Sequence, residues 1–259
     1  MLNGNVRPSA PLVSIVMPAY CAEKYIEAAI QSVVDQTYTN WELLVLDDGS
    51  QDNTIQIVQA LAKQDSRIRL YQNERNMGPA KTRNRGLDLS QGDYTAFLDS
   101  DDIWHADKLE KQVALAEREH ADIVYCSYAI IDGNNSKRCN DFLVPSRTDL
   151  KGLLKKNVIG CSTVLLSRAT VGDFRFSTDY YHEDYVLWLS MLQTGKKAVG
   201  LEEVLVDYRF HASGRAANKA SSAKHRWHIY RSFLGLSVVQ SLYYLSHYAL
   251  NGIVKYRPK

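Results

Sequence analysis

Acidic residues cluster at two points of the chain, directly after short apolar segments. Residues 47–50 read DDGS and residues 99–102 read DSDD. Carboxylates this close together repel one another, and a hard divalent cation bound through oxygen atoms would relieve the repulsion. Mg²⁺ binds through one or two carboxylates plus substrate phosphates, and Mn²⁺ would serve similarly. The pattern therefore predicts a metal-bound diphosphate, although a helix-capping or turn role would explain either cluster alone.

Alternating β-rich and amphipathic helical segments place both clusters in a predicted α/β fold. This alternation is typical of βαβ units and a parallel sheet. In open α/β sheets ligands bind beyond the carboxyl ends of the strands, which is where the two clusters lie. We expect strands at residues 12–17, 42–46, 68–71 and 94–98, and helices at residues 25–35, 54–63 and 79–89.

In the second half, expected helices and strands no longer alternate regularly. This change predicts a mixed, mainly parallel, Rossmann-like sheet flanked by helices. We expect specificity for substrates in the region 129–179, where residues 134–147 look like a polar loop. The expected elements are helices at residues 107–119 and 183–192, strands at residues 123–131, 161–166 and 204–210, and a turn at residues 132–135.

Composition and missing motifs exclude several classes of protein. The formal net charge of the 259 residues is only +2, so nucleic acid is not an expected partner. The four cysteines have no C-x-x-C spacing, which argues against a zinc site and a disulfide framework and suits a reduced cytosol. A phosphate-binding loop of the G-x-x-x-x-G-K-[ST] type and a G-x-G-x-x-G motif are both missing. Nucleoside triphosphatases, dinucleotide oxidoreductases and sugar nucleotidyltransferases with a glycine-rich first loop therefore become weaker interpretations.

Six motifs in order make the chain resemble the family 2 glycosyltransferases with the A-type fold, of the kind that assembles bacterial surface polysaccharides. The resemblance covers about residues 12–213. It rests on residues 13–20 (VSIVMPAY), DDGS with Asp52, N-x-G at 76–78 with R-N-x-G at 83–86, residues 98–102 (LDSDD), Glu183-Asp184, and Y-R-x-H at 208–211.

The resemblance implies a nucleotide-binding role for several of these residues. Asp48 would hydrogen-bond the nucleobase, typically uracil, and Arg83 would lie near the nucleotide. Pro18, Ala19 and Tyr20 would line the same pocket. One departure is Cys21, because the family usually has Asn at this position.

A second set of residues would bind metal, diphosphate and acceptor. Asp99 would face the ribose and could share the metal with Asp101, and His211 would approach the metal or the diphosphate. Arg209 is expected to contact the diphosphate or the acceptor. A lone His after a strand is also commonly only a surface residue. The Q-x-x-R-W element of processive polymerases is missing, which favours transfer of a single sugar.

Asp184 matches the general base of the family. A carboxylate opposite the leaving group would take the proton of the acceptor hydroxyl, and a single base on that face implies inversion at the sugar. Without the resemblance, the favoured interpretation would be that Glu183 and Asp184 only complement the N-terminal dipole of the helix expected at residues 183–192.

The last part of the chain is basic and aromatic. After Asp207 there is no acidic residue but nine Lys or Arg residues. We expect a catalytic domain at residues 1–213 and a helical extension at residues 214–259 that does not span a bilayer. Its apolar residues at 234, 238, 242, 245 and 249 and its flanking cations fit an interfacial helix, or pair of helices, on anionic lipid. The cations are Lys224, Arg226, Arg231, Lys255, Arg257 and Lys259. Packing on the catalytic domain or on a second subunit, with the cations solvated, is the alternative.

Together these features predict an inverting, Mn²⁺- or Mg²⁺-dependent glycosyltransferase. Its donor would be a nucleotide diphosphate sugar, and the resemblance favours UDP because it is the nucleotide that the family typically uses. The acceptor would be a lipid-linked saccharide at the cytoplasmic face of the membrane. A membrane-recruited nucleotide-sugar binding module without turnover and a nucleotidyltransferase remain as alternatives.

Overall fold

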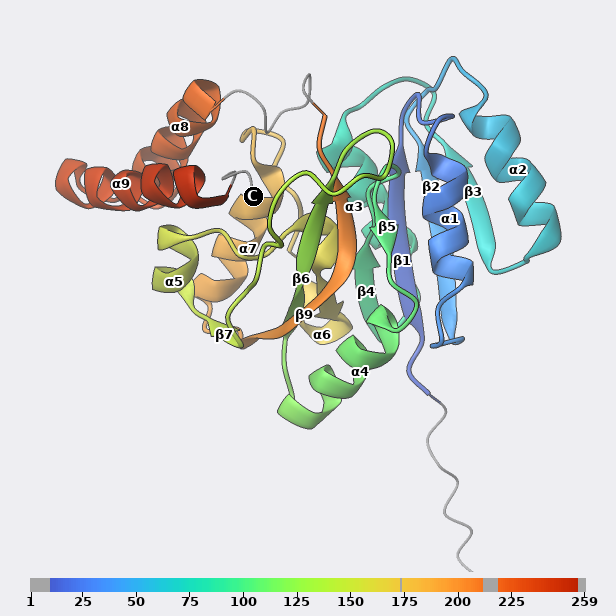
Figure 1. The fold of residues 1–259 in the computed structure, drawn as a ribbon, viewed down its shortest axis with the longest axis horizontal. Helices are drawn as coiled ribbons and strands as arrows, with labels where there is room; N and C mark the ends of the chain where they lie inside the picture. Colours follow the sequence, from blue (N-terminus) through green and yellow to red (C-terminus); the bar gives the residue numbers. More distant parts are fainter. Residues whose placement is uncertain (1–9, 173, 212–218, 256–259) are drawn as a thin grey trace, which may run out of the picture.

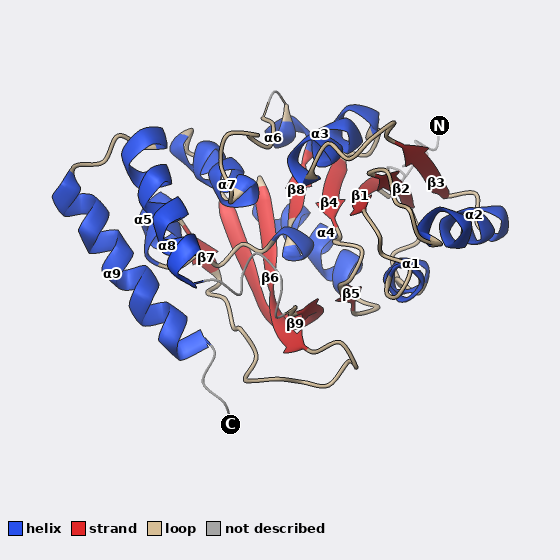
Figure 2. Cartoon of the chain, turned by 90° about the horizontal axis from the view of Figure 1, so that it is seen from above, coloured by secondary structure: helices blue, strands red, loops and turns tan. Residues whose placement is uncertain are grey.

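A nine-stranded mixed sheet forms the centre of the protein, with the strand order β3-β2-β1-β4-β8-β6-β9-β5 and with β7 paired to β9. The computed structural model describes residues 10–172, 174–211 and 219–255. Helices cover both faces of the sheet (Figure 1). Viewed from above, α3 and α7 lie on one face and α1 and α4 on the other (Figure 2).

The first half is the predicted parallel sheet. Strands β1 and β2 are buried along their length because helices cover both of their faces, and their sequences are accordingly near-continuous apolar runs. Every element expected in this half is confirmed to within two residues. The observed bounds are β1 (Val13–Ala19), α1 (Ile26–Val34), β2 (Trp41–Asp47), α2 (Thr54–Gln64), β3 (Ile68–Gln72), α3 (Pro79–Leu89) and β4 (Tyr94–Phe97).

The second half makes the sheet mixed, as expected. Strand β8 runs antiparallel to β4 and β6, whereas β6 and β9 are parallel. The observed elements are β5 (Ile103–Trp104), α4 (Lys108–Glu119), β6 (Ile123–Ile131), β7 (Arg147–Thr148), α5 (Leu150–Lys155), β8 (Leu165–Ser167), α6 (Arg168–Val171), α7 (Glu183–Gln193) and β9 (Ala198–Arg209).

The strand expected at residues 161–166 is wrong in its first half. Cys161–Thr163 forms a 3₁₀ turn, and only Leu165–Ser167 is strand. The hydroxyl of Thr163 causes the difference, because it accepts a hydrogen bond from the Gly160 N–H at 3.1 Å and donates one to the Gly160 carbonyl at 2.8 Å. This local pairing turns the backbone away from an extended conformation.

The C-terminal extension packs on the rest of the protein. It consists of α8 (Lys219–His228), a π-helical turn at Ile229–Phe233 and α9 (Val238–Lys255), and it lies beside α5 and α7 (Figure 2). Ile229 and Tyr230 are fully buried, and the Tyr230 hydroxyl donates to the Leu154 carbonyl at 3.2 Å. The expected boundary between residues 213 and 214 lies outside the described residues, as do Arg257 and Lys259.

One basic residue of the extension does not have the expected environment. Arg226 was expected on a solvated or lipid-facing surface, but only 7% of it is exposed. Its guanidinium lies over the rings of Tyr185 and Tyr248 at 4.1 Å and 4.4 Å. Among the described residues, no helix combines the length and the apolar character needed to cross a membrane.

Candidate active site

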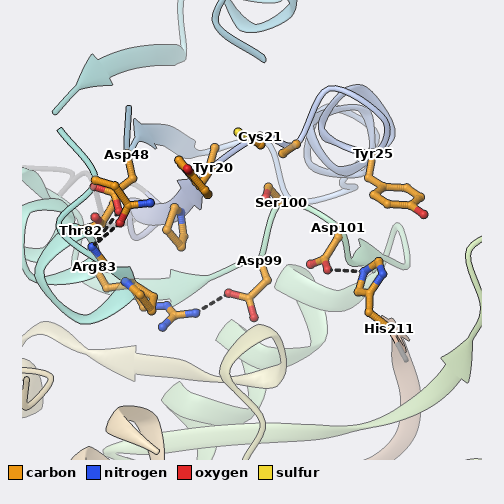
Figure 3. A pocket seen from close by; sticks show the side chains of 16 residues that line it. Tyr20, Cys21, Tyr25, Asp48, Thr82, Arg83, Asp99, Ser100, Asp101 and His211 are labelled. Atoms are coloured by element: carbon orange, nitrogen blue, oxygen red, sulfur yellow. Dashed lines mark hydrogen bonds and ion pairs between the residues drawn. The ribbon is translucent and has the colours of Figure 1, made fainter. Parts of the chain in front are cut away.

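The carboxyl ends of β1, β2 and β4 open onto a cavity of about 370 Å³. The neighbouring strands are parallel, so the residues that follow each of them meet at one edge of the sheet. Figure 3 shows their side chains converging from several elements. Eight of the predicted site residues line this cavity, namely Pro18, Ala19, Tyr20, Asp48, Arg83, Asp99, Asp101 and His211.

Asp48 is buried and holds one wall of this cavity. Its Oδ1 accepts hydrogen bonds from Asn73 Nδ2 at 2.7 Å and from the Met77 N–H at 2.9 Å, and its Oδ2 accepts one from the Gly78 N–H at 2.8 Å. An ionised carboxylate has about four acceptor sites. Asp48 can therefore accept one further N–H while fixing the loop that borders the cavity.

The backbone conformation at position 49 explains why a glycine follows the two aspartates. Its φ is +82°, a conformation that favours glycine. A Cβ at this position would lie 3.1 Å from the backbone nitrogen of Asn76. Any side chain here would push away the loop that Asp48 holds.

Arg83 joins the cavity to helix α7. Its Nη2 lies 2.6 Å from Asp99 Oδ1 and its Nη1 lies 2.9 Å from Glu183 Oε1. Arg83 and Glu183 are buried, whereas Asp99 is partly exposed in the cavity. Their pairing gives Glu183 a role that the sequence did not reveal, because the two residues are 100 positions apart.

Asp101 contacts His211 in the lining of the cavity. His211 Nε2 lies 2.8 Å from Asp101 Oδ2 (Figure 3). Burial raises the pKa of Asp101, and the charge of Asp99 adds to this rise. Burial also raises the pKa of Asp102, whose oxygens accept hydrogen bonds from the Ser162 hydroxyl at 2.5 Å and the Arg209 N–H at 2.8 Å. Asp102 thus stabilises the loop of residues 99–102 that follows β4, whereas Asp99 and Asp101 line the cavity.

The donor set fits a Mn²⁺ or Mg²⁺ ion that takes further ligands from a substrate. The described residues contain no group of three or more His, Cys, Asp or Glu side chains that could hold a metal alone. Asp101 with its neighbour Asp99 instead offers carboxylate oxygens whose mutual repulsion a cation would relieve. Such an ion typically completes its coordination with waters and phosphate oxygens.

Arg209 does not line this cavity. Its Nε donates to the Asp101 carbonyl at 2.7 Å and its Nη1 donates to the Asp132 carbonyl at 2.6 Å. The guanidinium also lies 4.4 Å from the centre of the Tyr25 ring. Arg209 therefore holds the loop that carries Asp101, and it lines a second cavity.

The second cavity has a volume of about 750 Å³ and adjoins the first. Four residues line both cavities, namely Arg83, Asp99, Asp101 and His211. Asp184 lines only the second. It lies half-buried on the first turn of α7, where its Oδ1 accepts the Tyr185 N–H at 2.7 Å. The predicted base and the predicted metal residues thus border one continuous space.

Comparison with known proteins agrees with this geometry. Residues 14–168 match the sequence model of glycosyl transferase family 2. The chain is 41% identical over 95% of both chains to the UDP-Glc:alpha-D-GlcNAc-diphosphoundecaprenol beta-1,3-glucosyltransferase WfgD of Escherichia coli. It is 35% identical to the putative teichuronic acid biosynthesis glycosyltransferase TuaG of Bacillus subtilis, over 95% of this chain and 97% of that one.

Solved structures with low sequence identity share the fold. Staphylococcus aureus TarS in complex with UDP-GlcNAc superposes with a TM-score of 0.71 and 21% identity, over 90% of this chain and 70% of that one. The mannosyltransferase PcManGT of Pyrobaculum calidifontis, in complex with GDP-Man and Mn²⁺, superposes with a TM-score of 0.72 and 18% identity, over 92% of this chain and 70% of that one. The sheet, the strand-end cavity and the sequence relatives lead to one conclusion: the chain belongs to the family 2 glycosyltransferases and has their A-type fold.

Proposed function

We propose that this glycosyltransferase moves one sugar from a UDP-sugar to a hydroxyl of a lipid-linked saccharide, with inversion and with Mn²⁺ or Mg²⁺. The observation that carries the proposal is the junction of the two cavities at Arg83, Asp99, Asp101 and His211. A donor in the first cavity and an acceptor in the second would meet at this junction. The names of its relatives support the choice of substrates, since WfgD uses UDP-Glc and a diphosphoundecaprenol-linked GlcNAc.

The first cavity suits the nucleotide part of the donor. The remaining acceptor site of Asp48 can take an N–H of the base, and the ring of Tyr20 lies at the cavity wall. Asp99 faces the same space and can accept from a ribose hydroxyl. TarS, which shares the fold, has been solved with UDP and with UDP-GlcNAc.

The reaction needs one proton transfer and one departing group. The acceptor hydroxyl oxygen bonds to the anomeric carbon while the bond from that carbon to the diphosphate oxygen breaks. The hydroxyl proton passes to the Asp184 carboxylate, and UDP leaves with the electron pair. A Mn²⁺ or Mg²⁺ ion held by Asp101 and Asp99, with His211 beside them, would supply positive charge near the departing diphosphate. Attack from the face opposite the leaving group gives inversion.

Substitution of the base tests the proposal. Asp184→Asn should lower the release of UDP in the presence of acceptor by about 10²–10⁴-fold, since general-base catalysis contributes roughly that factor. UDP binding in a thermal-shift assay should be unchanged. Asp179→Asn, an exposed aspartate shortly before α7, is the matched control. Wild-type turnover by Asp184→Asn would remove Asp184 as the base.

The product distinguishes the alternative functions. Release of nucleoside diphosphate supports sugar transfer, whereas release of pyrophosphate would indicate a nucleotidyltransferase. Binding of UDP-sugar with no product, across a panel of donors and acceptors, would indicate a binding module.

Peripheral contact with the inner face of the membrane is a further part of the proposal. Helix α9 exposes an apolar stripe that includes Val239 (77% exposed), Leu242 (54%) and Leu250 (63%). Such a stripe suits insertion into the lipid interface. Val239→Ser combined with Leu242→Ser should reduce sedimentation with anionic vesicles, whereas Leu143→Ser, an exposed leucine elsewhere, should not. Equal sedimentation of all three proteins would argue against this contact.

A further inference from the structure

Arg226 is a buried cation without an acidic partner. Among the described residues, the ionisable side chains that act on its charge are Tyr185, Tyr230 and Tyr248, with no carboxylate among them, and its Nε has no hydrogen-bond partner. Its near neighbours are the rings of Tyr185 and Tyr248, at 4.1 Å and 4.4 Å. Burying a charge without a counter-charge is costly, so such a residue suggests an anion that is supplied from outside the chain.

The side chain of Arg226 lies where a ligand can reach it. It lines the second cavity, which also contains Asp184. Lys155 and Lys156, at the end of α5, line the same cavity, and Lys155 is exposed. The cavity therefore has cations contributed by the end of α5 and by α8, in addition to the carboxylates of Asp99, Asp101, Glu183 and Asp184.

Two other cations of the cavity, Arg83 and Arg209, are already occupied. Arg83 is paired with Asp99 and Glu183, and two donors of Arg209 go to backbone carbonyls. Arg226 is also absent from the lining of the first cavity, where the donor diphosphate would lie. An anion bound by Arg226 would thus belong to the acceptor and not to the nucleotide sugar.

We propose that Arg226, with Lys155 and Lys156 beside it, binds the diphosphate group that links the acceptor saccharide to its lipid. This inference rests on the proposed function and adds a specificity-determining site to it. The volume of about 750 Å³ is within the range of roughly 300–1,000 Å³ typical of small-molecule sites, so it can hold a saccharide and a diphosphate together. The flanking tyrosine rings keep the planar guanidinium in one orientation, which favours bidentate contact with phosphate oxygens.

Two synthetic acceptors test the proposal. One is α-GlcNAc joined through a diphosphate to an alkyl chain, and the other is the same GlcNAc joined directly to the same chain. Binding to each is measured by calorimetry without turnover, and KM and kcat are measured with UDP-Glc. Arg226→Gln should raise the Kd and the KM for the diphosphate acceptor by about 10–100-fold, as expected for loss of charge-assisted hydrogen bonds. Affinity for the other acceptor and the KM for UDP-Glc should not change.

Companion variants separate recognition from folding. Arg226→Lys should recover part of the affinity, and Arg118→Gln, an exposed arginine on α4, should behave as wild type. If Arg226→Gln does not fold, the double variant Lys155→Gln/Lys156→Gln provides the test, with a several-fold loss expected for the diphosphate acceptor alone.

Three results with the variants would overturn the proposal. The first is an unchanged affinity of the Arg226→Gln or double lysine variant for the diphosphate acceptor. The second is an equal loss of affinity for both acceptors, and the third is a raised KM of the variant for UDP-Glc. A wild-type protein that binds both acceptors equally would overturn it as well. The proposed function fails separately, when the wild-type protein releases no UDP from any donor with any acceptor, because the binding measurements do not depend on turnover.

Discussion

The ion pairs of Arg83 allow one prediction with a calculable size. Only 4% of the Arg83 side chain and 5% of the Glu183 side chain are exposed, compared with 30% for Asp99. Arg83→Met would remove the Arg83 guanidinium from the buried Glu183 carboxylate. Breaking a buried pair in this way costs about 3–5 kcal/mol. For a domain of this size each kcal/mol lowers Tm by about 2–4 °C, so Tm should fall by roughly 6–20 °C.

A double variant then separates stability from catalysis. Arg83→Met/Glu183→Leu removes both buried charges, and apolar replacement of a buried pair is often neutral or stabilising. Most of the lost Tm should therefore return. Activity should stay about 100-fold below wild type in both variants, because Asp99 loses its 2.6 Å partner in the donor cavity and misplacement by about 1 Å has effects of this order.

The assays are thermal unfolding and UDP release, with Arg175→Met as the control. Arg175 pairs with Asp88 at 2.8 Å, but both side chains are solvent-exposed, so its loss should cost only about 0–1 kcal/mol. The reasoning is refuted if Arg83→Met melts within about 2 °C of wild type. It is equally refuted if the double variant melts as low as the single one.

Three further predictions concern buried and exposed groups. Burial lowers the pKa of Lys108 from 10.5 to about 8. Between pH 8 and pH 10.5 the unfolded chain therefore binds more protons than the folded one. The free energy of unfolding should rise with pH in this range. Lys108→Met should be more stable than wild type at pH 7 by urea unfolding, and this advantage should shrink at pH 9.5; a constant difference would contradict it. Cys21 is the exposed cysteine among four, so iodoacetamide should label it first, and UDP with Mn²⁺ should slow the labelling if the nucleotide occupies the first cavity. Cys21 has a φ of +47°, which Asn tolerates better, so Cys21→Asn should raise the free energy of unfolding by up to about 1 kcal/mol; a lower Tm would oppose this explanation.

Local sequence patterns predicted the first half of the fold because its elements follow simple periods. Strands β1 and β2 are near-continuous apolar runs, and α3 begins at a proline that its first turn favours. The strand-end rule then placed the carboxylates of Asp48, Asp99 and Asp101 at a common cavity. Each of these inferences needs only neighbours in sequence and a general rule of topology.

Contacts between distant segments were not predictable in this way. The first half of β9 was missed because its middle, around Glu202 and Glu203, is exposed and polar and lacks strand periodicity. Glu183 was interpreted through the helix dipole, since nothing near it in sequence reveals Arg83. Arg209 was expected at the diphosphate or the acceptor, and its hydrogen bonds to the backbone carbonyls of Asp101 and Asp132 could not be predicted because they join segments far apart in the sequence.

Arg226 shows why the charge of a segment does not determine where its residues lie. From composition, every cation after Asp207 has the same expected environment, because no acidic residue remains to pair with it. Packing of Ile229 and Tyr230 into the core fixes the orientation of the preceding helix and turns Arg226 inward, while Lys224 on the same helix stays exposed. The apolar residues of the extension thus select which cation reaches the cavity. A single buried guanidinium in the same cavity as the predicted base can distinguish among acceptors, whereas a solvated basic face could contribute only nonspecific attraction to anions.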